Sequence, residues 1–437
     1  MCGTLIVCYF IHTQPKKVDA GIRLENVTGK GVPDMKFRQI ATFLGLAIVP
    51  TMWAHTASAD NVKIGSLGAI TGPIVSLVAE INKAERAAIA EINKAGGILG
   101  KKVALVEADT ACNPQTAVDA ANKLINIERV SIIVGALCSG ASISAHSNVA
   151  KNSNVAMISP ASTSPAITTL SDNDLFFRVV PSDAFQGIML AKLVLSKGTK
   201  KVALTWINND YGKGFADAFK ASYIAGGGKI TNSSGHEEGK ASYRSELATL
   251  AKGGADTLVL LAYGDGSGVT MMKQALEGGL FKTFVGGDGM KSDKLVSTLG
   301  ATNLKGHFYG TIATGKSSSE ADKFKAMYGN GKSFKFNSPY ANNGYDAIMI
   351  SALAIAAAGK TDRAAVAKAV RKVASAPGAQ VGPGDMAKAL KLINQGKDIN
   401  YQGASGPHDF DKNGDVPGVI AEWQISGNGY KVSDPMK

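Results

Sequence analysis

Short apolar runs alternate with helical segments along the chain once the first 60 residues are passed. Two of these runs, residues 131–135 and 155–159, are apolar at nearly every position, which is typical of parallel strands buried on both faces. Residues 141–152, between them, have a helical pattern. The segment is therefore predicted to be a β-α-β unit with a loop at the carboxyl end of each strand.

The two loops that follow these strands are rich in small polar residues. The first contains Cys138 and Ser139, and the second contains Ala161, Ser162 and Thr163. In open α/β sheets, ligands bind at the carboxyl ends of the strands, where backbone N–H groups and hydroxyls point outward. Two such loops side by side predict a donor-rich site for a small anion such as a carboxylate. The alternative is that the hydroxyl groups only cap helices.

The same alternation of strands and helices begins again after residue 183. The strands predicted for the two halves are residues 62–67, 102–108, 131–135 and 155–159, then 201–207, 229–233, 257–262 and 283–285. A third phase has helices near residues 320–328, 340–358 and 363–373, and an extended tail at 406–410 and 419–425. The fold class is predicted to be α/β, with right-handed crossovers, two similar lobes and a cleft between their loops.

Polar residues also follow the predicted strands of the second lobe. Asp288 lies on a Gly-Gly-Asp-Gly loop at a strand end, where a carboxylate could bind a ligand ammonium through a charge-assisted hydrogen bond. Tyr211 and Tyr263 are candidates for the walls of the pocket. The simpler explanations are an ordinary turn aspartate and tyrosines that pack on their own lobe.

The composition narrows the class of protein. The chain has 437 residues, of which 45% are hydrophobic, and this is long enough for two domains with their own cores. The formal net charge is +12, but the basic residues are scattered singly. Aromatic residues make up 7% and are not interleaved with basic clusters, so a nucleic-acid partner is not expected.

The amino-terminal segment indicates export. Residues 35–59 have a positively charged start, an apolar run too short to span a membrane, and a small-residue cleavage site that ends at Ala59. They are interpreted as a secretory signal peptide; the alternative is a membrane anchor. Residues 1–34 precede a better start at Met35 and are interpreted as a mis-called upstream extension.

Two of the four cysteines, Cys112 and Cys138, fall in the exported part. An even pair in an oxidising compartment favours a disulfide, which would join two loops at one edge of the sheet. A catalytic Cys138 is the alternative, but no histidine stands in a convincing relation to it.

Other motifs are weak. Residues 310–317 match a phosphate-loop pattern, but the segment has an extended pattern, which favours a connector between lobes. Residues 409–414 copy the first half of a calcium loop, yet the twelfth position is Ile420, so a turn is favoured. No histidine pair at metal spacing and no nucleophile elbow occur, and His146 is expected to lie on the surface or to pack. No cofactor, metal or enzymatic activity is predicted.

Taken together, these features resemble the periplasmic solute-binding proteins of the leucine/isoleucine/valine type, which serve ABC importers. The resemblance covers the chain from Asp60 to its end. The motifs that carry it are Gly68-Ala-Ile-Thr-Gly72-Pro73, Asn93-Lys-Ala-Gly-Gly-Ile-Leu-Gly100, Asp109-Thr-Ala-Cys112-Asn-Pro114, Leu137-Cys138-Ser139, Ile158-Ser-Pro-Ala-Ser-Thr163 and Asp210-Tyr211-Gly212-Lys-Gly214. One departure is Ser76-Leu77, where such proteins often carry an aromatic residue.

The resemblance implies a type I periplasmic binding protein fold, in which two Rossmann-like lobes are joined by a three-strand hinge. Pro181, Ala313 and Ser405 would lie near the hinge. The amino-terminal lobe would comprise residues 60–180 and 313–404, and the carboxy-terminal lobe residues 181–312 and 405–437.

The resemblance also implies the roles of the site residues. The ligand carboxylate would be held at Ser139, Ala161 and Thr163, with Ser162 beside them. Asp288 would bind the ammonium group, and Tyr211 would cover the ligand. The loop that begins at Tyr263 differs from the usual tyrosine placement of the family.

Cys112 and Cys138 would form a disulfide. The implied function is non-enzymatic: a periplasmic monomer that closes around an amino acid and delivers it to an ABC permease in the inner membrane. A sensing module for amides, urea or aromatic acids, working with a separate receptor, is the alternative. An exported hydrolase is a third hypothesis.

Overall fold

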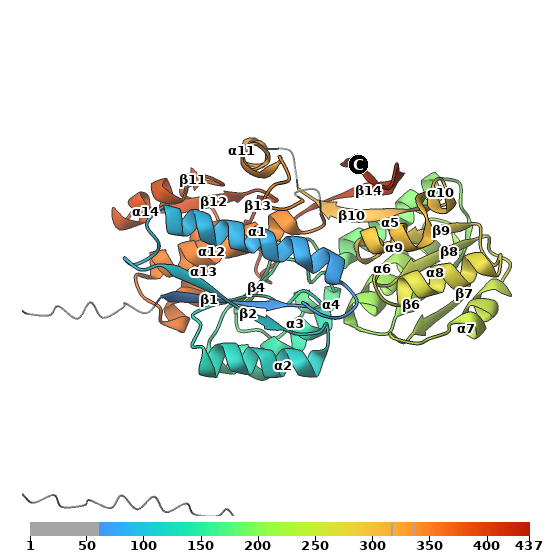
Figure 1. Cartoon of the computed structure of the whole chain (residues 1–437), viewed down its shortest axis with the longest axis horizontal. Coiled ribbons are helices and arrows are strands. Elements are labelled where there is room, and N and C mark those ends of the chain that lie inside the picture. Colours follow the sequence, from blue (N-terminus) through green and yellow to red (C-terminus); the bar gives the residue numbers. More distant parts are fainter. Residues whose placement is uncertain (1–60, 316–317, 336–337) are drawn as a thin grey trace, which may run out of the picture. The chain divides into compact units, whose positions relative to one another are not determined.

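The computed structural model describes residues 61–315, 318–335 and 338–437, which form two α/β lobes (Figure 1). The predicted upstream extension, residues 1–34, and the predicted signal peptide, residues 35–59, fall outside the described residues. Within the described ranges, no helix combines the length and the apolar character needed to cross a lipid bilayer.

A five-stranded sheet forms the centre of the first lobe. Its order is β2-β1-β3-β4-β5, and every neighbouring pair of strands runs parallel. The strands are β1 (Val62–Gly68), β2 (Val103–Asp109), β3 (Ile133–Gly135), β4 (Met157–Ser159) and β5 (Phe176–Arg178). The predicted β-α-β unit at residues 131–159 is confirmed, with its loops at one edge of this sheet.

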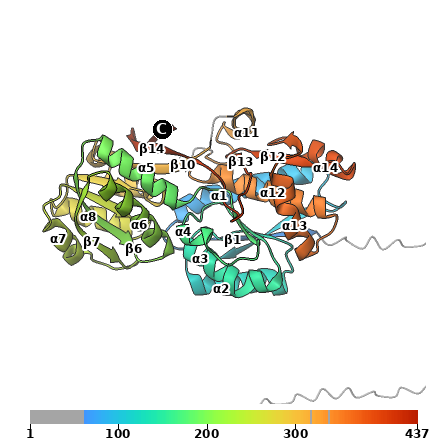
Figure 2. The same cartoon turned by 180° about the vertical axis from the view of Figure 1, so that it is seen from behind.

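Helices cover both faces of this sheet (Figures 1 and 2). Val134 packs in one core with α12 (Ala341–Ala358), whereas its neighbour Ile133 packs in another core with α2 (Pro114–Asn122). Successive residues on a strand point to opposite faces, so burial of both faces requires apolar side chains at consecutive positions. This explains the uninterrupted apolar runs in the sequence.

The first lobe contains further elements. They are α1 (Val75–Lys94), α3 (Ser139–Ala145), α4 (Pro165–Thr168), α11 (Ser319–Tyr328), α13 (Arg363–Ala374) and α14 (Met386–Asn394), with a small sheet of β11 (Ala379–Val381), β12 (Ile399–Gly403) and β13 (Gly406–Pro407). Helices α2 and α3 continue into π-helical turns at Lys123–Ile127 and His146–Ala150. The pattern of the sequence did not predict α14, β11 or β12, whereas β13 falls within the extended segment predicted at 406–410.

A seven-stranded sheet forms the second lobe, in the order β15-β14-β10-β9-β8-β6-β7. Its strands are β6 (Lys201–Ile207), β7 (Lys229–His236), β8 (Thr257–Leu261), β9 (Thr283–Gly286), β10 (Phe308–Thr314), β14 (Val419–Ser426) and β15 (Gly429–Pro435). Its helices are α5 (Asp183–Ser196), α6 (Asp210–Ala225), α7 (Arg244–Ala251), α8 (Ser267–Glu277), α9 (Asp293–Leu299) and α10 (Ala301–Leu304). Within the described ranges, β14 runs antiparallel to both of its neighbours, β10 and β15, and the other neighbouring pairs of this sheet are parallel.

Along the described elements, the chain changes lobe three times. It leaves the first lobe between β5 and α5, and it returns after β10. Before the third passage, β13 still pairs with β12, and Asp415 binds Arg178 of β5. The third passage therefore follows residue 415, and the boundary predicted at 404–405 is too early for this packing.

The buried Arg178–Asp415 pair explains the position of that passage. Arg178 is fully buried, and its Nε and Nη2 atoms donate to Asp415 at 2.6 and 2.8 Å. A buried charge that lost its partner would be strongly destabilising, so the segment up to residue 415 must stay on the first lobe.

The weak motifs take structural roles. Residues 310–314 of the phosphate-loop pattern lie inside β10 and pair with β9 and β14, while Lys316 and Ser317 fall outside the described residues. In the calcium-like segment, Asp411 accepts hydrogen bonds from the N–H groups of Asn413 and Asp415 and so closes a turn. His146 is buried and meets Phe176 edge to face.

Candidate functional site

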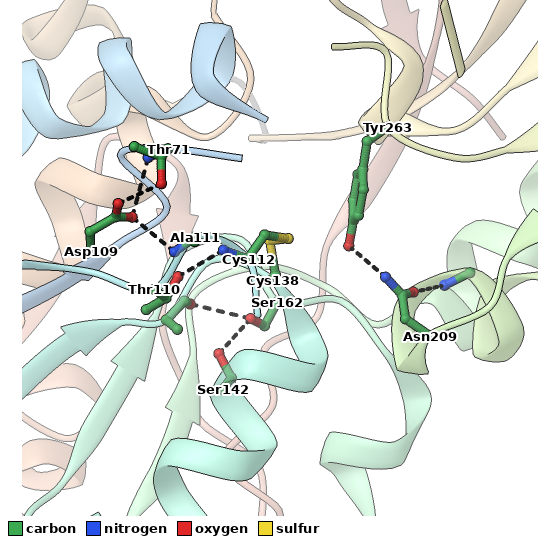
Figure 3. The surroundings of a disulfide bond; sticks show 12 residues. Thr71, Asp109, Thr110, Ala111, Cys112, Cys138, Ser142, Ser162, Asn209 and Tyr263 are labelled. Atoms are coloured by element: carbon green, nitrogen blue, oxygen red, sulfur yellow. Dashed lines mark hydrogen bonds between the residues drawn. A yellow bond between two sulfur atoms is a disulfide. The ribbon is translucent and has the colours of Figure 1, made fainter. Parts of the chain in front are cut away.

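A disulfide fixes two loops at the edge of the first sheet (Figure 3). Cys112 and Cys138 are bonded, with their Cα atoms 5.4 Å apart, as the sequence predicted. The loop that carries Cys112 is also held by Asp109, which accepts from the Oγ1 atom of Thr71 at 2.6 Å and from the N–H group of Ala111 at 2.8 Å. Cys138 is therefore anchored directly before the first residue of α3.

That first residue is Ser139, a predicted site residue. Its side chain is buried, and its Oγ atom accepts a hydrogen bond from the N–H group of Ser164 at 3.2 Å. Ser159 shapes the neighbouring loop, since its Oγ atom donates to the carbonyl of Ala136 at 2.6 Å and accepts from the N–H group of Ser162 at 3.0 Å. The loop from β4 is thus held beside the start of α3.

Ser162 has a different role from the one predicted. Its Oγ atom lies 2.7 Å from the Oγ atom of Ser142 and 3.2 Å from the carbonyl oxygen of Ala136 (Figure 3). These contacts point into the first lobe and join the two loops. The hydroxyl group of Ser162 therefore positions its neighbours Ala161 and Thr163 rather than facing the cavity.

Two tyrosines of the second lobe stack on each other. The rings of Tyr211 and Tyr263 lie 5.3 Å apart at an angle of 10°. The hydroxyl of Tyr263 accepts from Asn209 at 3.4 Å (Figure 3), and Asn209 also caps α6 by accepting from the N–H group of Gly212. The cap and the stacked pair hold both rings in place.

Asp288 is buried, with 4% of its surface exposed. Its Oδ1 atom accepts from the Nε2 atom of Gln186 at 3.0 Å and from the hydroxyl of Tyr211 at 3.2 Å. Burial raises the pKa of the Asp288 carboxyl above its ordinary value, because the charged form loses its hydration. A bound cation would reverse this penalty.

One cavity brings together residues of both lobes. Its polar lining residues are Ser139 of the first lobe, Tyr211, Tyr263 and Asp288 of the second lobe, and Tyr340. Its other lining residues are Ile74, Leu77, Leu137, Ala161 and Gly289. The cavity volume is about 20 Å³, which holds no more than a water molecule or two, so an organic ligand requires the walls to move apart.

Most of the predicted site residues are thus brought together. Ser139, Ala161, Tyr211, Tyr263 and Asp288 line the cavity, whereas Thr163 is fully buried and is not among the lining residues. Sequence reasoning missed further residues that line the cavity: Tyr340 and the apolar Ile74, Leu77 and Leu137. It also missed Asp183 and Gln186 of α5, of which Gln186 donates to Asp288.

The missed residues gave only weak signals. Asp183 follows Pro181 and Ser182, a pattern that indicates the start of a helix and nothing more. Tyr340 precedes α12 with a φ of 62°, in the left-handed region, and no sequence motif marks it. Leu77 stands near the place where an aromatic residue was expected, and it makes that end of the cavity aliphatic.

The fold and this cavity are those of a two-lobed solute-binding protein, with Ser139 from one lobe and the carboxylate of Asp288 from the other lining the cavity. The chain belongs to the periplasmic binding protein family, whose model matches residues 61–414. The class predicted from the sequence is therefore confirmed.

Similar proteins agree with this assignment. The chain is 30% identical to a Leu/Ile/Val-binding protein homolog of Brucella melitensis over 74% of this chain and 87% of that protein. It is also 30% identical to a leucine-, isoleucine-, valine-, threonine- and alanine-binding protein of Pseudomonas aeruginosa, over 73% and 84% of the two chains.

Among solved structures, the branched-chain amino acid binding protein LivJ of Streptococcus pneumoniae, in complex with isoleucine, is similar with a TM-score of 0.69 and 25% identity. The match covers 86% of this chain and 99% of that one. A benzoate complex from R. palustris has a TM-score of 0.67 at 17% identity, over 86% and 96% of the two chains, and shows the shared fold alone.

Proposed function

We propose that this protein binds an α-amino acid with an aliphatic side chain, of the branched-chain type, and delivers it to an ABC permease as a periplasmic monomer. The observation that carries the proposal is the distribution of polarity around one cavity. Ser139 and the start of α3 supply donors on one wall, Asp288 supplies a carboxylate on the other, and aliphatic side chains complete the lining.

The lining of the cavity offers a complementary group to each part of an amino acid. The α-carboxylate suits the hydroxyl of Ser139 and the N–H groups beside it, because such donors favour anions. The ammonium suits Asp288, through a charge-assisted hydrogen bond. Ile74, Leu77 and Leu137 suit an aliphatic side chain, whose burial contributes about 0.8 kcal/mol per CH₂ group.

Binding would stabilise the closed arrangement of the lobes. A ligand that contacts both walls favours the state in which the walls are close, by the difference in its affinity for the two states. Uptake and release then require opening along the three connecting segments. A permease that recognises the closed form would receive only loaded protein.

A thermal-shift panel on protein that begins at Asp60, freed of co-purified ligand by unfolding and refolding, tests the proposal. Leucine, isoleucine and valine are compared with lysine, aspartate, urea, acetamide and benzoate. A ligand at about one hundred times its dissociation constant adds roughly 2.7 kcal/mol to stability, which gives a clear rise in Tm.

We expect rises with the aliphatic amino acids and none with lysine or aspartate, whose charges would meet the aliphatic wall. A rise with benzoate or urea alone would contradict the proposed ligand. That outcome would favour the second hypothesis, a binder or sensor of aromatic acids or amides.

A further inference from the structure

Several buried polar atoms beside Asp288 make no hydrogen bond to any described residue. They include the carboxylate oxygens of Asp183 and Gln186 Oε1, while the hydroxyls of Thr163 and Tyr340 face the carboxyls of Asp183 and Asp288 without a well-formed hydrogen bond. Buried polar groups nearly always have a partner, because an unpartnered one costs its full desolvation. A concentration of such atoms at one place indicates a ligand group that satisfies them.

The fold places Asp183 next to Asp288. Asp183 and Gln186 are separated by three residues in the first turn of α5, so their side chains lie on one face of the helix. Gln186 reaches from this face to Asp288, with its Nε2 atom 3.0 Å from Oδ1. Asp183 is fully buried, and its N–H group donates to the carbonyl of Thr163 at 2.7 Å.

In the described part of the chain, no lysine or arginine forms an ion pair with either carboxylate. Arg178 is the basic side chain whose charge acts on Asp183, but its guanidinium already binds Asp415 and the carbonyl of Ser164. The other ionisable groups around the pair are hydroxyls, those of Tyr211, Tyr263 and Tyr340. Burial raises their pKa values, so the tyrosines stay neutral and supply no charge.

We infer that Asp183 is a second carboxylate for the ligand ammonium, acting together with Asp288, and that this pair restricts the ligands to those with a protonated amine. This inference rests on the proposed function and deepens it. An ammonium group has three N–H donors, and the carboxylates of Asp183 and Asp288 are strong acceptors, with the hydroxyls of Thr163 and Tyr340 beside them. An acid without an amino group would leave two buried carboxylates uncompensated.

Ligand binding is also expected to change the protonation of the two carboxyl groups. Without a ligand, burial raises the pKa of Asp183, and the neighbouring charge of Asp288 raises it further. A bound ammonium favours the ionised form of both groups, so their pKa values fall on binding. Binding is therefore expected to release protons, and affinity should rise as pH rises through the range in which the ligand-free pair titrates.

Titration calorimetry with two probes tests the inference. L-leucine is compared with 4-methylpentanoate, which has the same side chain and carboxylate but no amino group. The proteins are the wild type, Asp183→Asn, Asp288→Asn and, as a matched control, Glu85→Gln. Glu85 is buried on α1 and bonded to Ser66, away from the cavity.

For wild type and Glu85→Gln, we expect leucine to bind at least a hundredfold more tightly than 4-methylpentanoate. Asp183→Asn should lose at least tenfold in affinity for leucine and none for 4-methylpentanoate. The ratio of the two affinities should therefore fall at least tenfold. An Asp183→Asn variant within twofold of wild type for both probes overturns the inference while leaving the proposed function intact.

A measurement on the wild type covers the case in which Asp183→Asn does not fold. Leucine binding is titrated in two buffers of different ionisation enthalpy, which reports the protons exchanged. Net proton release supports the inference, and its absence overturns it. Failure of the wild type to bind any of leucine, isoleucine or valine would instead refute the proposed function, and the inference with it.

Discussion

At the scale of the residue, two serines on α3 have different roles: one lines the ligand cavity and the other packs inside the lobe. Ser139 lines the cavity, whereas Ser142, one turn later, bonds Ser162 inside the lobe. We expect Ser139→Ala to weaken leucine binding about fivefold, since one hydrogen bond is worth roughly 1 kcal/mol. The change in the free energy of unfolding should be smaller than that caused by Ser142→Ala.

Ser142→Ala is the control, because it should lower stability by about 1–2 kcal/mol and leave affinity unchanged. Calorimetry and urea unfolding of both variants check this pair of outcomes. Equal losses of affinity in the two variants would mean that Ser139 acts only through packing.

His146 makes stability depend on pH. Burial lowers its pKa from 6.5 to about 4, so the unfolded chain binds a proton more readily than the folded chain in that interval. Its contribution is fully present above pH 6.5 and is lost as the pH falls toward 4, by about 2 kcal/mol at pH 5.

His146→Leu should reduce the loss of unfolding free energy between pH 7.5 and pH 5 by this amount, because leucine fills the apolar site beside Phe176 without titrating. Urea unfolding at the two pH values measures the difference. A variant with the same pH dependence as wild type would exclude His146 as the source.

At the scale of the element, a residue of the second lobe caps the amino terminus of a helix in the first lobe. Helix α1 begins after Ile74, which offers no side-chain cap, and no acidic residue lies in its first turn. Asp265 of the second lobe takes that role, since its Oδ2 atom accepts from the N–H group of Ser76 at 2.7 Å. Ser292 donates to the other oxygen of the same carboxylate.

Because this cap exists only while the lobes are closed, Asp265→Ala should destabilise the closed state by about 1 kcal/mol. We expect leucine to dissociate about fivefold faster, with little change in the association rate. Asp256→Ala is the control, because Asp256 is 73% exposed in its side chain and pairs with Lys282 on the surface. Stopped-flow kinetics with an unchanged dissociation rate for Asp265→Ala would contradict a role in closure.

The disulfide links the strand ends that form the carboxylate side of the cavity. It joins residues 26 apart in the sequence, for which the loss of unfolded-state entropy predicts about 3.5 kcal/mol of stability. Replacement of Cys112 and Cys138 by serine should therefore lower Tm and weaken ligand binding, since Ser139 loses its anchor. Reductant should lower the Tm of wild type but not of the double variant, and an insensitive wild type would contradict this account.

Closure is the property expected of the whole molecule. The cavity of about 20 Å³ is too small for leucine, so the lobes must move apart to admit the ligand and then close around it with the walls farther apart than in this structure. Small-angle scattering of ligand-free protein should give a larger radius of gyration than protein saturated with leucine. Asp288→Ala at the same leucine concentration should stay expanded, and a wild type whose radius does not respond would rule out this mechanism.

Much of the architecture could be predicted because it depends on local pattern. Consecutive apolar residues such as Ile133 and Val134 indicate strands buried on both faces, and the loops after parallel strands must meet at one edge. The parts that were missed, such as α14 and the third passage after residue 415, depend on distant packing. Arg178 and Asp415 are 237 residues apart, and only the folded chain shows that they form one ion pair.

The sequence by itself determined the α/β class, the repeated lobes, the cysteine pair and the small polar loops that contain Ser139 and Ala161, because each follows from neighbouring residues. Tertiary structure alone decided that Ser162 turns inward and that Asp183 lies beside Asp288. Those facts depend on which side chains meet across the cavity. Contacts of that kind join residues that are far apart in the chain, at strand ends, at the start of a helix and across the two lobes. The local sequence pattern does not predict them.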